Sequence, residues 1–75
     1  MTVSAKIKAL LKIREKSNGE LAEHLGISDQ GIRQKLYTDT FSISDLIRIC
    51  AFLGYELSIA DEQQKLILNE SDIKK

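Results

Sequence analysis

The chain of 75 residues contains no proline and no tryptophan, and only 5% of its residues are aromatic. Sandwiches and barrels are built from many short strands, which are rich in aromatic residues and are separated by turns that often contain proline. A chain with few aromatic residues and no proline therefore favours aliphatic helices. The sequence also lacks a run of about 20 uncharged apolar residues and a signal-peptide core. These absences predict a small, soluble, mainly α protein in the cytoplasm, with no membrane segment.

Cysteine and histidine are each present once, as Cys50 and His24. One cysteine cannot form an internal disulfide, and no second ligand stands at chelating spacing, so neither a disulfide framework nor a metal site is predicted. We expect His24 to be a surface or capping residue, and Cys50 to be a small core residue. No catalytic triad, phosphate-binding glycine loop or pair of carboxylates is evident. The sequence therefore predicts a protein that is not an enzyme and has no cofactor or small-molecule ligand.

Eleven basic and eleven acidic residues give a net charge of zero, whereas proteins that bind nucleic acids usually carry a surplus of basic residues. The two charges are not evenly distributed. Residues 1–55 hold eight basic and six acidic side chains, and residues 56–75 hold three and five. This weak asymmetry permits a polyanionic partner for the first part of the chain without requiring one.

Two helices are predicted in the first third of the chain. Apolar residues at helical spacing predict a first, amphipathic helix over residues 4–16. Ser17 and Glu20 then have the spacing of a capping box, which predicts that a second, short helix starts near Asn18. Gly26 ends this helix, because glycine readily takes the left-handed conformation of a helix C-cap.

A third helix is predicted over residues 29–37, with Ser28 as its N-cap. Ile32 and Leu36 are spaced to point inward, which leaves polar side chains on the outer face. Gly31 inside this helix costs about 1 kcal/mol relative to alanine. A glycine at such a position suggests a close approach to the backbone, although a helix can also simply tolerate it.

The next segment, residues 38–43, is predicted to be a polar connection. Ser44, followed by Asp45, is expected to cap a fourth helix that ends at Gly54. The predicted apolar stripe of this helix consists of Leu46, Ile49, Cys50 and Leu53.

After Gly54 the apolar period changes from that of a helix to the alternation of a strand. The pattern predicts a β-hairpin over residues 55–68, with its turn at residues 61–65, and a flexible tail over residues 69–75. Because an isolated two-stranded hairpin is marginally stable, it must pack on the helices or pair with another chain. We therefore predict a domain over residues 1–54, extended by the hairpin.

Two short helices joined by a tight glycine-containing turn are typical of a helix-turn-helix, in which a small residue, here Ala22, allows the helices to cross closely. The apolar pattern resembles that of the phage Cro-type repressor family, also called XRE-like. The resemblance covers about residues 4–54 and includes the helix before the motif and the helix that ends at Gly54. Its motif residues are Leu21, Ala22, Leu25, Gly26, Ile27 and Ile32.

The resemblance implies a four-helix, lambda-repressor-like helix-turn-helix domain, with a C-terminal β-hairpin in place of the fifth helix of many members. Lys35 departs from the pattern, because the family often has an apolar residue there; we interpret Leu36 as a shifted anchor. The hairpin puts the family's usual dimer contact in doubt, though not the DNA-binding unit.

In such a domain the helix over residues 29–37 lies in the major groove of DNA. The residues expected to contact base edges are Asp29, Gln30, Arg33 and Gln34. Those expected to contact phosphates are Asn18, Ser28, Thr38, Thr40 and Ser42. Asp29 has a second interpretation, a favourable interaction with the helix dipole. The threonines after the helix have one too, ordinary turn chemistry.

Two functions remain open at this point. The first is a sequence-specific transcriptional regulator, a repressor of the phage or mobile-element type, that binds double-stranded DNA as a homodimer. Its dimer contact is either the 55–68 hairpin or a helix. The second is a protein-interaction module such as an antitoxin-like or adaptor domain. The polar outer face of the third helix favours DNA, because an apolar row there would favour a protein partner.

Overall fold

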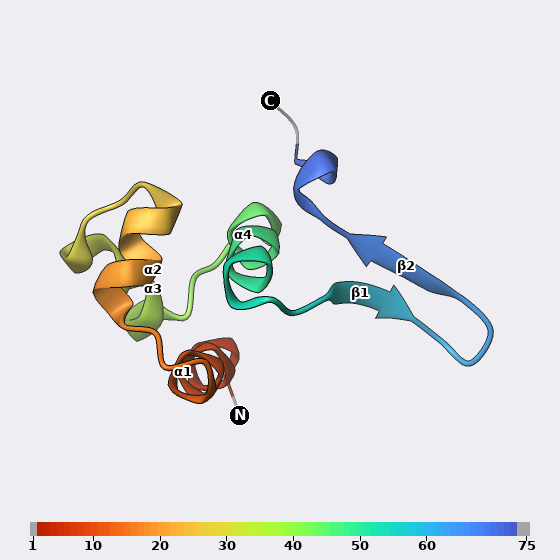
Figure 1. Cartoon of the computed structure of the whole chain (residues 1–75), viewed down its shortest axis with the longest axis horizontal. Coiled ribbons are helices and arrows are strands. Elements are labelled where there is room, and N and C mark those ends of the chain that lie inside the picture. Colours follow the sequence, from red (N-terminus) through yellow and green to blue (C-terminus); the bar gives the residue numbers. More distant parts are fainter. Residues whose placement is uncertain (1, 74–75) are drawn as a thin grey trace. The chain divides into compact units, whose positions relative to one another are not determined.

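The computed structural model describes residues 2–73, which belong to two compact units, Met1–Phe41 and Ser42–Lys75. Figure 1 shows four helices followed by a two-stranded antiparallel hairpin, so the predicted fold class is confirmed. The predicted domain limits, 1–54 and 55–68, stay predictions.

The first unit consists of three helices, α1 (Val3–Ile13), α2 (Asn18–Leu25) and α3 (Asp29–Thr38). Every one of them begins at a hydroxyl side chain that accepts a hydrogen bond from the first turn, with Thr2, Ser17 and Ser28 as the N-caps. The first helix ends at Ile13, three residues earlier than predicted, and the chain turns through Glu15, whose φ is 56°. Both α1 and α2 contact α3.

The second unit begins with α4 (Ile43–Leu53), and here the predicted start was wrong. Ser42, not Ser44, is the N-cap, because the Ser42 hydroxyl and the Asp45 carboxylate have the reciprocal spacing of a capping box. The predicted stripe also needs correction. Ile47 is buried, whereas Leu46 and Cys50 are half-buried.

The hairpin comprises β1 (Leu57–Ala60) and β2 (Lys65–Leu68), with Leu57 opposite Leu68 and Ile59 opposite Leu66. Residues opposite each other share one face of the sheet, so these four aliphatic side chains lie on the same face. Within this unit, β1 contacts α4.

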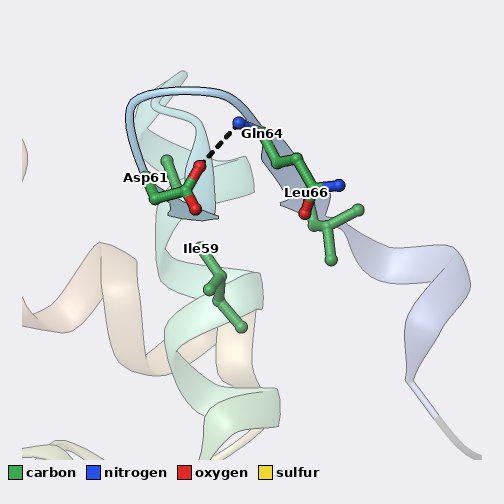
Figure 2. A pocket seen from close by; sticks show the side chains of 5 residues that line it. Ile59, Asp61, Gln64 and Leu66 are labelled. Atoms are coloured by element: carbon green, nitrogen blue, oxygen red, sulfur yellow. Dashed lines mark hydrogen bonds between the residues drawn. The ribbon is translucent and has the colours of Figure 1, made fainter.

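The turn of the hairpin covers four residues, 61–64, since Lys65 belongs to β2 and not to the turn as predicted. The Asp61 carboxylate accepts hydrogen bonds from the backbone N–H groups of Gln63 and Gln64, at 2.8 and 2.7 Å. Figure 2 shows the second of these bonds, with Ile59 and Leu66 on the two strands beside it. These bonds hold the pKa of the Asp61 carboxyl below its usual value.

A 3₁₀ turn, η1 (Glu70–Asp72), follows the hairpin within the segment that was predicted to be a flexible tail. Asn69 and Asp72 form a capping box around it, and η1 contacts α4. This spacing was visible in the sequence as Asn-x-x-Asp, but no apolar run follows it to indicate a helix. Residues 74–75 of the predicted tail lie outside the described residues.

No helix in the described part of the chain has the length and apolarity that crossing a membrane requires.

Candidate nucleic-acid interface

The connection between α2 and α3 is held by the turn that the sequence predicted. Gly26 takes the left-handed conformation, with φ 73° and ψ 29°, and the Ile27 backbone N–H donates to the Ala22 carbonyl at 3.0 Å. The Ser28 hydroxyl, two residues after Gly26, accepts a hydrogen bond from the Gly31 backbone N–H, also at 3.0 Å, and α3 begins there. Two helices therefore follow each other with only residues 26–28 between them.

Packing between these two helices uses the predicted anchors. Leu21 and Ile32 have no exposed surface, and Ala22 is 1% exposed. Leu36 is buried as well, which confirms it as the anchor in place of the half-buried Lys35. A side chain larger than alanine at position 22 would have to displace a neighbour in this close-packed core.

Gly31 is explained by a contact within the turn itself. A Cβ atom on Gly31 would stand 3.3 Å from the Ser28 hydroxyl oxygen and 3.6 Å from the Ile27 Cβ atom. The close approach that the sequence suggested is thus made by the N-cap and the residue before it. A side chain at position 31 would crowd the hydroxyl that caps α3.

The outer face of α3 is polar and exposed to solvent. Gln30, Arg33 and Gln34 are all exposed, and Tyr37 further along the helix is 88% exposed. Tyr37 was not among the predicted site residues, although it follows Arg33 by four positions and Gln34 by three, so helical spacing places it on the same face. The face therefore presents two amides, one guanidinium and one phenol, side chains that can form hydrogen bonds with a partner.

Asp29 differs from these side chains in where its carboxylate lies. Its two oxygens are 3.6 and 3.9 Å from the point at which a Cβ atom on Gly19 would stand, so they lie against the first turn of α2. Asp29 is also the first residue of α3 and is exposed. This position suits its second interpretation, because carboxylates are stabilised near helix N-termini.

The five residues predicted to contact phosphates lie in different settings. Asn18 is the first residue of α2, and Ser28 is the N-cap of α3, with the Ser28 hydroxyl proton still able to donate. Thr38 closes α3, and its hydroxyl donates to the Gln34 carbonyl at 2.8 Å, while the Thr38 and Thr40 hydroxyls are 2.6 Å apart. Ser42 caps α4 and belongs to the second unit.

Sequence reasoning missed a link between the end of α3 and the start of α1. The Asp39 carboxylate accepts two hydrogen bonds from Ser4, one from its hydroxyl and one from its backbone N–H, both at 2.7 Å. Asp39 is the C-cap of α3 in the left-handed conformation, with φ 55°, which aspartate tolerates better than most residues. The Ser4 hydroxyl, followed by the Ser4 backbone N–H, holds the pKa of the Asp39 carboxyl below its usual value.

This lowered pKa predicts that the first unit loses stability in acid. The unfolded pKa of Asp39 is about 3.8 and the folded pKa is lower, so the ionised carboxylate stabilises the fold above pH 3.8, and this stabilisation is lost as the pH falls through the folded pKa. Ser4→Ala removes the larger cause of the shift. We therefore expect this variant to move the Asp39 pKa upward and to weaken the acid dependence of the unfolding midpoint.

An NMR titration of the side-chain carboxyl carbons measures the pKa of each carboxyl group, and thermal unfolding followed by circular dichroism at several pH values measures the acid dependence of the unfolding midpoint. Asp61, whose pKa is also lowered, serves as an internal control, because Ser4→Ala leaves its partners Gln63 and Gln64 unchanged. An Asp39 carboxyl that titrates at the same pH in the wild type and in Ser4→Ala would contradict the prediction.

The remaining titratable candidates do not form a site. Burial raises the pKa of the Cys50 thiol, as expected for a half-buried cysteine. His24 lies in the last turn of α2. Among the described residues, no three His, Cys, Asp or Glu side chains are grouped closely enough to hold a metal ion.

No protein-family model, no curated protein and no solved structure matches this chain.

Proposed function

We propose that this protein is a sequence-specific DNA-binding transcriptional regulator, a repressor of the phage or mobile-element type, in which α3 lies in the major groove. The observation that carries the proposal is the division of α3 into two faces. Ile32 and Leu36 are buried, whereas Gln30, Arg33 and Gln34 are exposed. A short helix anchored on one side and polar on the other has the form that fits a groove of DNA.

Base recognition is assigned to Asp29, Gln30, Arg33 and Gln34. A glutamine amide forms two hydrogen bonds with an adenine edge, and a guanidinium forms two with a guanine edge. A carboxylate accepts a hydrogen bond from the amino group of cytosine. Each good pair discriminates against the wrong base by roughly 1 to 3 kcal/mol. Gln30 and Gln34 are one helical turn apart and Arg33 is beside them, so the three side chains can contact neighbouring base pairs.

Phosphate contacts are assigned to Asn18, Ser28, Thr38, Thr40 and Ser42. Ser28 is the best placed by its hydrogen bonds, because its oxygen caps Gly31 while its proton can still be donated to a phosphate. Thr38 needs a rearrangement, since its proton is donated to the Gln34 carbonyl. The contacts of the first unit, from Asn18, Ser28, Thr38 and Thr40, fix the position of α3 in the groove and carry no sequence information of their own.

The test is an amide NMR titration of the labelled protein with mixed-sequence duplex DNA, at low and at higher salt. We expect salt-sensitive shifts at Asn18, at residues 29–34 and at residues 38–42, because phosphate attraction persists without the cognate sequence. Arg33→Ala should weaken the binding about five- to tenfold. Lys8→Ala removes the same charge from the exposed side of α1, as a matched control, and should change the affinity less.

Shifts that cluster elsewhere, or an Arg33→Ala variant that binds like the wild type while Lys8→Ala does not, would contradict the assignment of α3. The absence of any shift at low salt would reject DNA binding altogether. That result would favour the second candidate, a protein-interaction module such as an antitoxin-like or adaptor domain, for which the exposed aliphatic side chains Ile59 and Leu66 are the specific observation.

We further propose that the protein acts in the cytoplasm as a homodimer formed through the 55–68 hairpin. A single chain of this size covers little DNA, whereas two copies of the chain related by a two-fold axis bind two half-sites. Ile59 and Leu66 are 64% and 65% exposed, and a shallow hollow of about 140 Å³ lies beside them. Each strand of a two-stranded hairpin also has one edge without a partner strand, and the same edge of a second copy can pair with it.

A further inference from the structure

The position of the Asp29 carboxylate has a consequence for how strongly the surface attracts DNA. This carboxylate lies at the beginning of α3 and, at the same time, against the first turn of α2 near Gly19. Both helix starts carry partial positive charge from their backbone N–H groups. One exposed side chain with a full negative charge therefore stands next to two helix starts that would otherwise attract anions.

The backbone phosphates of DNA are anions that approach the same place. In the proposed complex the first turn of α2 and the N-cap of α3 face phosphates, through Asn18 and Ser28. A phosphate that reaches either residue comes close to the Asp29 carboxylate and is repelled by it. The first turn of α2 has a carboxylate of its own, that of Glu20. It accepts a hydrogen bond from the Ser17 backbone N–H and lies 3.9 Å from the Lys16 ammonium, which partly offsets its charge.

We propose that Asp29 is a specificity-determining residue: its carboxylate repels the phosphates of any DNA, and this loss is offset only at a site where the carboxylate accepts a hydrogen bond from a cytosine amino group. This inference rests on the proposed function. Attraction to phosphates supplies most of the non-specific affinity of a DNA-binding protein, and a regulator must distinguish its site from a large excess of other DNA. The net charge of zero likewise limits the attraction of the whole chain to phosphates.

Asp29→Asn tests the role of the charge in the full chain, because asparagine has nearly the same shape and remains acceptable at a helix start. We expect this variant to bind a mixed-sequence duplex about five- to tenfold more tightly than the wild type at low salt. We also expect the slope of log affinity against log salt to become steeper by about 1. Fluorescence anisotropy of a labelled duplex at several salt concentrations measures both quantities.

Two further variants separate the local effect from other causes. Glu70→Gln changes the net charge by the same amount at an exposed position in η1, outside the hairpin assigned to dimerisation, and should alter the affinity less than twofold. Asp29→Ser removes the charge with a shorter side chain and should reproduce the gain, so the result does not depend on how asparagine packs. A base contact cannot explain the gain, because mixed-sequence DNA has no fixed base for Asp29 and the loss of a contact would not increase affinity.

The outcomes distinguish this inference from the function on which it rests. If Asp29→Asn binds equally or more weakly while Arg33→Ala still weakens binding, the inference is overturned and DNA binding stands. The same conclusion follows if Glu70→Gln gains as much affinity as Asp29→Asn. If neither the wild type nor the Asp29 variants bind DNA at low salt, the proposed function and the inference are both rejected.

Discussion

Replacing Leu21 by alanine is expected to lower the free energy of unfolding of the first unit by about 2 to 5 kcal/mol. The Leu21 side chain has no exposed surface and lies on α2, which packs against α3. Truncation removes several buried methyl groups and leaves a cavity that a tightly packed helix pair fills only in part. Since small domains are stable by only about 5 to 15 kcal/mol, this change removes a large fraction of the total.

Urea unfolding followed by far-ultraviolet circular dichroism gives the energy, and amide signals of residues 18–38 show that the loss falls in the first unit. Tyr37→Ala is the matched control, because Tyr37 lies on α3 but is 88% exposed. It should change the unfolding free energy by no more than about 0.5 kcal/mol. A loss below 1 kcal/mol for Leu21→Ala would mean that the interior between α2 and α3 is not closely packed.

The second large effect concerns the assembly. Leu66→Lys is expected to convert the proposed dimer into a monomer, with a dimer dissociation constant raised at least about a hundredfold. An aliphatic side chain that is 65% exposed in the single chain would be covered in the dimer, and a buried lysine without a partner is strongly unfavourable there. The single chain should fold as before, because position 66 is largely in solvent.

Analytical ultracentrifugation of both proteins at micromolar concentrations measures the dissociation constant. Ser58→Lys adds the same charge to β1 at an exposed position, one residue away from the Ile59–Leu66 pair and so on the opposite face of the strand. We expect this control to remain largely dimeric. A wild-type protein that sediments as a monomer at high micromolar concentration would rule out the homodimer.

The local parts of the fold could be predicted from the sequence because their signals are short-range. The spacing of Ser17 and Glu20 predicted the start of α2. Gly26 and Gly54 end their helices in the left-handed conformation, with φ values of 73° and 77°. Hydroxyl caps and C-terminal glycines act within one helical turn.

The start and the buried face of α4 were harder to predict for a definite reason. Ser42 and Ser44 both precede Asp45, and only the hydrogen bonds distinguish the N-cap from a residue inside the first turn. The helix is also apolar on most of its surface. Several stripes therefore fit the helical period equally well, and the spacing alone could not select the buried Ile47.

For the candidate site, the sequence was sufficient to predict which side chains of α3 point outward, because Gln30, Arg33 and Gln34 alternate with the anchors at helical spacing. It could not predict contacts that depend on where separate helices meet. The approach of Asp29 to Gly19 is one of these contacts, and the hydrogen bonds between Asp39 and Ser4 are another. Both pairs are far enough apart in the sequence that no local pattern connects them.

The link between Asp39 and Ser4 also bears on the order in which the first unit assembles. These residues are 35 positions apart, whereas α2 and α3 are joined by only residues 26–28 and can pack as soon as they form. Loop-closure entropy grows with the length of chain enclosed, and contacts distant in sequence slow folding. We infer that α2 and α3 associate first and that α1 attaches afterwards, with the Asp39 carboxylate closing the unit in a late step.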